Sequence, residues 1–93
     1  MGIPLDPPPI ATDIESSEVL RVWAIANAPH QLTINTTWKD PGAWGLLLVD
    51  IARHASLAYE ADGRMDASAA LARIRSLFDA EWNAPTDEPK NIT

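Results

Sequence analysis

DPGAWGLLLVDIARHASLAYEAD, residues 40–62, is the stretch that decides the fold, because it has helix signals at both ends. Asp40 can accept a hydrogen bond from the first free backbone N–H groups, and Pro41 suits the first helical position. Gly63 can adopt the left-handed conformation that ends a helix. The sequence therefore predicts one long helix.

This helix has a broad apolar face and further apolar residues on its polar side. At roughly 100° per residue, Leu46, Val49 and Leu57 fall among polar side chains. A helix that is apolar nearly all round is usually buried on more than one side. Either other parts of the chain or a partner must cover that back side. The main face consists of Trp44, Leu47, Leu48, Ile51, Ala52, Ala55, Ala58 and Tyr59.

A second helix is predicted over residues 66–83, where apolar residues form one stripe behind a capping Asp66. The connection Gly63-Arg64-Met65 is short, which favours an antiparallel helix pair. The stripe consists of Ala67, Ala70, Leu71, Ile74, Leu77, Phe78 and Trp82.

Two strands are predicted ahead of the helices. Residues 18–27 are rich in β-branched and aromatic side chains, and residues 30–38 alternate apolar and polar side chains. Turn-forming residues separate them, so an antiparallel hairpin is the simplest connection.

The register of this hairpin has two alternatives. An even-numbered loop would pair Ile25 with Leu32 and Trp23 with Ile34, and it is preferred because these residues bury the most apolar area. With an odd-numbered loop, the residues beside the face that carries Leu32 and Ile34 would instead be Leu20, Val22 and Ala24.

The predicted fold class is α+β with the order ββαα: an antiparallel hairpin covered on one face by two antiparallel helices. Dimerisation could complete the hairpin into a larger sheet. Residues 1–16 are a flexible proline-rich arm, residues 17–84 the domain, and residues 85–93 a flexible acidic tail. The predicted core consists of Trp44, Leu48, Ile51, Ile74, Leu77 and Phe78.

Composition excludes several classes of protein. The chain has 93 residues, a net charge of −6 and no cysteine, so disulfides and thiolate chemistry are excluded. The acidic excess lies near the ends, and no basic patch offers a site for nucleic acid. No apolar run approaches the roughly 20 residues that span a membrane, and no signal peptide is visible. A cytoplasmic location is expected.

Candidate ligand-binding residues lie on the long helix. Asp50 and His54 are four residues apart, with Arg53 beside them and Trp44 upstream, and a carboxylate can orient an imidazole for acid/base work. A surface i,i+4 pair explains the spacing equally well. Metal sites need three or four ligands, so no metal site is predicted. No cofactor and no catalytic residue are assigned from the sequence.

Each of the four predicted elements contains one tryptophan. An aromatic cage for a ligand is one reading, and a shared core is the preferred one, because each tryptophan lies within the apolar pattern of its element. The tryptophans are Trp23, Trp38, Trp44 and Trp82.

Three runs, VLRVWAIA, DPGAWGLLLVDIARH and ALARIRSLFDAEWNAPTD, resemble a family of small bacterial proteins described only as a domain of unknown function. The resemblance covers most of residues 18–87 and implies a bacterial, cytoplasmic protein with no assigned activity. The matching residues are Trp23, Trp44, Asp50, Arg53, His54, Phe78 and Trp82.

Two functions remain open from the sequence. The first is a non-enzymatic interaction module, a homodimer or a protein bound to another protein, in which the extra apolar surface is the interface. The rival is a small-molecule-binding or catalytic protein that uses Asp50, Arg53 and His54 near Trp44. The candidate interface residues are Leu20, Val22, Leu46, Val49 and Leu57.

Overall fold

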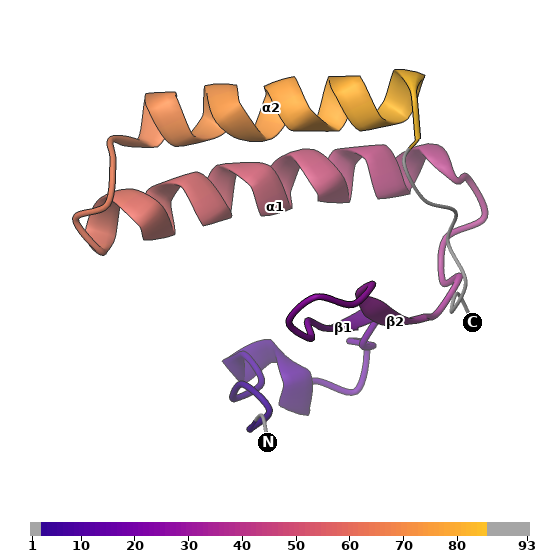
Figure 1. Cartoon of the computed structure of the whole chain (residues 1–93). Helices are drawn as coiled ribbons and strands as arrows, with labels where there is room; N and C mark the ends of the chain where they lie inside the picture. The colour runs from indigo at the N-terminus through magenta and orange to yellow at the C-terminus, as the bar shows by residue number, and fades with distance from the viewer. Residues whose placement is uncertain (1–2, 86–93) are drawn as a thin grey trace. The chain divides into compact units, whose positions relative to one another are not determined.

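The computed structural model describes residues 3–85 and confirms an α+β chain of order ββαα (Figure 1). A 3₁₀ helix, η1, precedes the two strands, and two α-helices follow them. The chain forms two units, one ending at Thr37 and one beginning at Trp38, and each is described by itself. The elements are η1 (Pro9–Thr12), β1 (Leu20–Trp23), β2 (Gln31–Ile34), α1 (Gly42–Ala61) and α2 (Ala67–Asn83).

The strands β1 and β2 pair in antiparallel fashion, with Leu20 opposite Ile34 and Val22 opposite Leu32. The preferred even register is therefore wrong, and the odd alternative is the one that forms. The reason is an early turn, because the Ala28 N–H donates to the Ile25 carbonyl at 3.3 Å. Ile25 thus belongs to the loop, residues 24–30, and has no strand partner.

The strands are also shorter than the predicted ranges 18–27 and 30–38. Beyond the ladder, the Asn35 N–H still donates to the Val19 carbonyl at 2.9 Å. The loop contains Asn27 in the left-handed region, at φ 61°, which an asparagine tolerates better than most residues. This bend diverts the chain from the extended path that the β-branched composition predicted.

The proline-rich arm contains the short helix η1, which the sequence reading did not predict. The Ala11 N–H donates to the Pro8 carbonyl, and the Asp13 N–H donates to the Ile10 carbonyl, both at 2.9 Å. The Thr12 hydroxyl adds a bond to the Pro9 carbonyl at 3.1 Å. Prolines fit this turn because their fixed φ is helical and their missing N–H is not needed there. The predicted tail, residues 85–93, lies outside the described residues except for its first position.

The predicted signals lie at the two ends of α1, with a shift of one residue at the start. The helix begins at Gly42, so Pro41 is the N-cap residue and not the first helical residue, and no side chain caps the helix there. The Asp40 carboxylate, one position earlier, accepts a hydrogen bond from the Gly42 N–H at 2.8 Å. At the other end Gly63 has φ 73°. Its N–H donates to the Glu60 carbonyl and the Arg64 N–H donates to the Tyr59 carbonyl, both at 3.0 Å, which is the Schellman arrangement.

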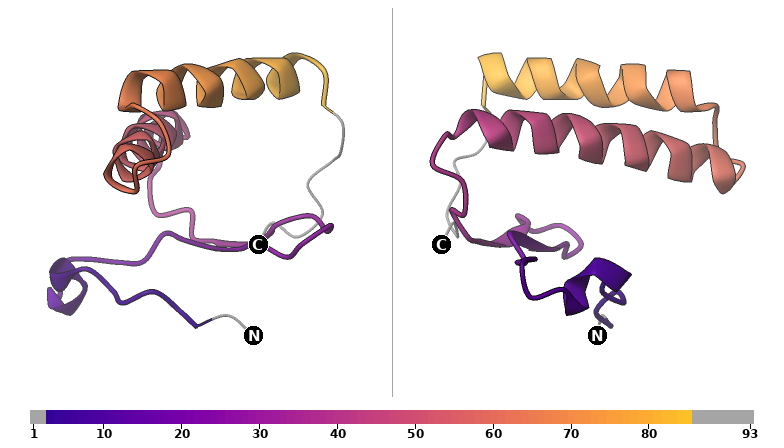
Figure 2. Two further views of the ribbon diagram at one scale, coloured as in Figure 1. Left: turned by 60° about the vertical axis from the view of Figure 1, so that its left-hand side comes forward. Right: turned by 180° about the vertical axis from the view of Figure 1, so that it is seen from behind.

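The helix α2 begins with the predicted cap. The Asp66 carboxylate accepts hydrogen bonds from the Ala69 N–H at 2.7 Å and the Ser68 hydroxyl at 2.9 Å. These bonds, the one from the Ala69 N–H first, hold the pKa of Asp66 below its ordinary value. The two helices are joined at one end by the short loop and run antiparallel, as Figures 1 and 2 show.

The contact between α1 and α2 is made through small residues. Ala70 is 3% exposed and Ser56 is 2% exposed, and the Ser56 hydroxyl donates to the Ala52 carbonyl at 2.8 Å. Small side chains let two helix backbones approach closely, so larger neighbours are displaced to the flanks of the pair. Ala70 is therefore the buried hydrophobic residue of the described chain.

The predicted core between the sheet and the helices stays a prediction, because the two units are described separately. Within the helix pair, four of its six members are exposed, whereas Trp44 and Ile74 are half-buried. The helices as a cover for the sheet stay a prediction. The exposed members are Leu48 at 44%, Ile51 at 42%, Leu77 at 54% and Phe78 at 44%.

Candidate functional site

A groove of about 1000 Å³ lies between α1 and α2 and is here called the helical groove. The start of α1 and the end of α2 lie at the same end of this helix pair (Figure 1). The groove is lined by Pro41, Gly42, Trp44, Gly45, Leu48, Val49, Ala52, Arg53, Ser68, Leu71, Ala72, Ile74, Arg75, Phe78, Asp79 and Trp82.

The walls of the helical groove are mainly apolar and open to water. Val49 is 52% exposed on the α1 wall, and Trp82 is 73% exposed on the α2 wall. The Phe78 and Trp82 rings stack with their centroids 5.6 Å apart, so that the indole rests on a neighbouring ring on one side only. A large aromatic surface is therefore exposed at the open end of the helix pair, which is the end opposite the loop between α1 and α2.

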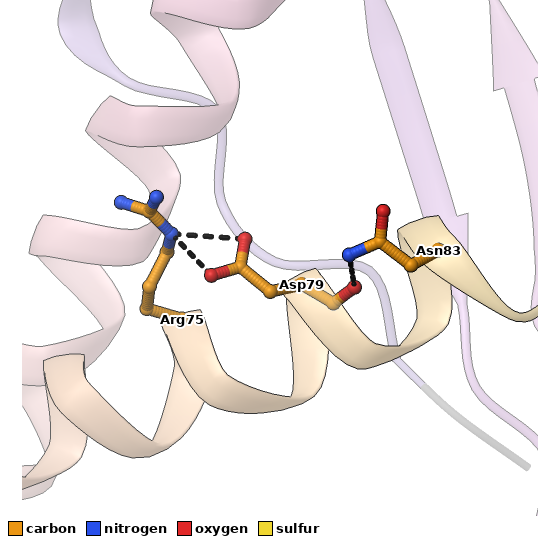
Figure 3. Close-up of polar contacts among 3 residues, drawn as sticks. All are labelled: Arg75, Asp79 and Asn83. Atoms are coloured by element: carbon orange, nitrogen blue, oxygen red, sulfur yellow. Dashed lines mark hydrogen bonds and ion pairs between the residues drawn. The ribbon is translucent and has the colours of Figure 1, made fainter.

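The polar rim of the groove is largely neutralised on the α2 side. The Arg75 Nε donates to both carboxylate oxygens of Asp79, at 3.0 and 2.9 Å. The Asn83 side-chain amide donates to the Asp79 carbonyl at 2.8 Å, as Figure 3 shows. This ion pair fixes two rim side chains on the surface of α2 but is too exposed to contribute much to stability.

The structure separates the four predicted ligand-binding residues. Trp44 and Arg53 line the helical groove, whereas Asp50 and His54 are not among its lining residues. The His54 Nδ1 lies 2.8 Å from the Asp50 backbone carbonyl, to which an Nδ1–H donates, so the imidazole is held by the main chain of its own helix. Ligand binding by these residues stays a prediction. Among residues 3–85, no group of three or more acidic or histidine side chains is placed to hold a metal ion.

The structure brings two of the four tryptophans together, and a core shared by all four stays a prediction because Trp23 lies in the other unit. Trp38 and Trp44 meet edge to face with their centroids 5.4 Å apart. Trp38 remains 38% exposed, and Trp23, in the other unit, is 41% exposed. Trp82 is more exposed still, at 73%.

The candidate interface residues are mostly exposed. Leu46 is 73% exposed, Leu57 58% and Val22 49%, while Leu20 is half-buried in the strand pair. Val49 lines the helical groove, whereas Leu46 and Leu57 are not among its lining residues. An interface through these residues stays a prediction.

The sequence reading missed Gly45, which lies within α1 and lines the groove. A Cβ atom added at Gly45 would meet no heavy atom within 4 Å. A glycine inside a helix costs about 1 kcal/mol relative to alanine, so its presence there was the available signal.

The chain is a small α+β protein in which a β-hairpin precedes a helical hairpin. Its most distinctive feature is the exposed apolar surface of the helical groove. Residues 4–86 match the family described as a domain of unknown function, DUF5076. The chain belongs to this family, which confirms the resemblance seen in the sequence.

One solved structure shows the same fold. It is described as that of "a putative pyruvate dehydrogenase" from the photosynthetic bacterium Rhodopseudomonas palustrus CGA009. The two chains share 36% identity with a TM-score of 0.77, over 97% of this chain and 94% of that one. No curated protein matches this chain. Within residues 3–85, none of the helices has the length and apolar character needed to cross a membrane.

Proposed function

We propose that this protein is a non-enzymatic interaction module that associates with a second copy of itself. The observation that supports this is the imbalance of the helix pair: the fully buried residues are small, whereas most of the large apolar residues on α1 and α2 are exposed. Apolar surface of this extent on a folded protein is typical of an interface.

The exposed apolar area has the size that a stable dimer needs. The exposed fractions on α1 and α2 add up to about five whole side chains, or roughly 1,000 Å² at about 200 Å² each. One partner in a standard interface buries about 800 Å². The residues are Leu46 at 73%, Leu48 at 44%, Val49 at 52%, Ile51 at 42%, Leu57 at 58%, Tyr59 at 40%, Leu77 at 54%, Phe78 at 44% and Trp82 at 73%.

A bacterial cytoplasmic setting is part of this proposal. It is supported by the bacterial source of the structure that shares 36% identity with this chain. The negative net charge of −6 fits a protein partner without a phosphate backbone, so nucleic acid is not proposed as a ligand.

The dependence of thermal stability on protein concentration tests self-association. If two chains fold as a dimer, Tm rises as the protein is concentrated, because association stabilises only the folded state. A Tm that stays constant over a hundredfold change in concentration would contradict the proposal. Val22→Lys and Leu46→Lys, each sized by sedimentation, separate a seam along β1 from a seam along α1.

Ligand binding in the helical groove is the second candidate function, because Trp44 and Arg53 line the groove. The description of the similar structure names a pyruvate dehydrogenase, so pyruvate is the ligand to test first. Isothermal titration of the protein with pyruvate, with Arg53→Ala as the matched variant, would show saturable heat in the parent alone if this candidate is correct. Self-association without bound pyruvate supports the first proposal.

A further inference from the structure

We propose that the helical groove is the seam of the dimer, and that Trp82 of each copy packs over Gly45 of the other. This inference rests on the proposed self-association and adds the surface and the residues that make it. It commits to a second copy of this chain as the occupant of the groove.

Gly45 is the first observation. The residue lies in the first turns of α1 and has no conformational need for glycine, because it is helical and a Cβ atom there would touch nothing in its own chain. A glycine that weakens a helix without an internal reason is explained by close approach of something outside the chain. The space beside Gly45 opens into the helical groove.

Trp82 is the second observation. The indole is 73% exposed, and its described ring contact is the stack on Phe78. Tryptophan is enriched among residues that dominate binding energy, and these residues fill pockets on the partner. Trp82 therefore has the properties of an anchor residue, and the open space at Gly45 leaves room for its indole ring.

The symmetry of the arrangement selects a second copy over an unrelated protein. A twofold dimer needs one surface that carries both halves of a complementary pair, so that each copy gives and receives the same contact. The helical groove carries both the gap at Gly45 and the projecting Trp82, and both lie at the open end of the helix pair. A twofold axis along the groove brings α1 of one copy beside α2 of the other. Gly45 of one copy and Trp82 of the other then lie at the same height along this axis.

The rest of the groove suits this pairing. Beyond Gly45, the α1 wall continues with Leu48, Val49 and the shorter Ala52, and the α2 wall carries Leu71, Ile74 and the shorter Ala72, so large and small apolar side chains alternate for interdigitation. Two helix pairs can approach closely along such walls and form a four-helix bundle. The ion pair of Arg75 with Asp79 lies at the rim, where it stays in water and costs no desolvation.

The test measures the dimer dissociation constant by sedimentation equilibrium for matched variants. Gly45→Gln fills the gap, and Trp82→Ala removes the anchor, so each is expected to raise Kd by about 30-fold or more. Ala80→Gln adds the same side chain at an exposed position of α2 outside the groove, and Met65→Ala truncates an exposed apolar residue outside it. Both controls are expected to stay within about twofold of the parent.

A further variant excludes unfolding as the cause. Gly45→Ala favours the helix and would raise Tm if the groove faced water, whereas in the proposed seam it weakens the dimer. Far-UV circular dichroism checks that every variant keeps its helix content. A parent dimer that Gly45→Gln and Trp82→Ala leave intact would overturn this inference while self-association stands. A parent that is a monomer at every concentration would overturn both.

Discussion

Ala70→Leu is expected to destabilise the helix pair more than the same substitution at any other alanine of α2. Ala70 is buried where α2 meets α1, with 3% of its surface exposed. Leucine adds three carbon atoms where the helices meet through small residues. Overpacking of this kind costs about 1–3 kcal/mol, a substantial share of the roughly 5–14 kcal/mol expected for a chain of this length.

The assay is thermal unfolding followed by far-UV circular dichroism at one fixed protein concentration. For a domain of this size, the cost corresponds to a fall in Tm of roughly 5–20 °C. Ala80→Leu makes the same chemical change at an exposed position of the same helix and is expected to shift Tm by less than about 2 °C. Equal Tm values for Ala70→Leu and Ala80→Leu would refute the close contact of α1 and α2 at Ala70.

Three further predictions concern the helix ends and the rim. Asp66→Ala lowers Tm at pH 7, because the hydrogen bonds that Asp66 accepts lower its pKa in the folded state below the ordinary value. The cap contributes fully above the ordinary pKa, and its contribution is lost as pH falls through the lowered pKa, so the Tm values of parent and variant converge in acid titrations. Gly63→Ala is expected to lower the free energy of unfolding by about 1 kcal/mol in urea, because φ at Gly63 is 73° and an added Cβ would meet no neighbouring atom within 4 Å. Asparagine tolerates the left-handed region better than alanine, so an equal or greater loss for Gly63→Asn would contradict this cause. Arg75→Ala changes the free energy of unfolding by less than about 0.5 kcal/mol, since its ion pair with Asp79 is exposed, and a larger loss would show that the pair is buried in an assembly.

Local chemistry is what the sequence predicted well. The cap at Asp66, the hydrogen bond from the Gly42 N–H to Asp40 and the left-handed Gly63 all depend on residues within one helical turn of one another. Such interactions are independent of what the rest of the chain does. The helices were therefore predicted to within a residue or two of their observed ends.

The strand register depended on competition between two local structures. The apolar area of Trp23 and Ile25 favoured the even register, but the turn that begins at Ile25 and continues through Asn27 removes Ile25 from the ladder. A composition rich in β-branched residues carries no information about where such a turn starts. The sequence could offer both registers and could not rank them correctly.

The core and the candidate site depend on contacts that the pattern of a single helix does not define. The apolar stripes were identified correctly, but a pattern marks which residues avoid water and does not say which molecule covers them. Leu48 and Phe78 were assigned to the core of one chain and are 44% exposed in it. Gly45 was missed because its open surroundings are visible only in the folded helix pair.

The mass of the parent protein in solution tests self-association most directly. Sedimentation equilibrium at micromolar concentrations is expected to give twice the chain mass of 10.1 kDa, with the dimer dissociating on dilution. A single species of 10.1 kDa up to millimolar concentration would contradict the account and would mean that the exposed residues of α1 and α2 are covered from within one chain.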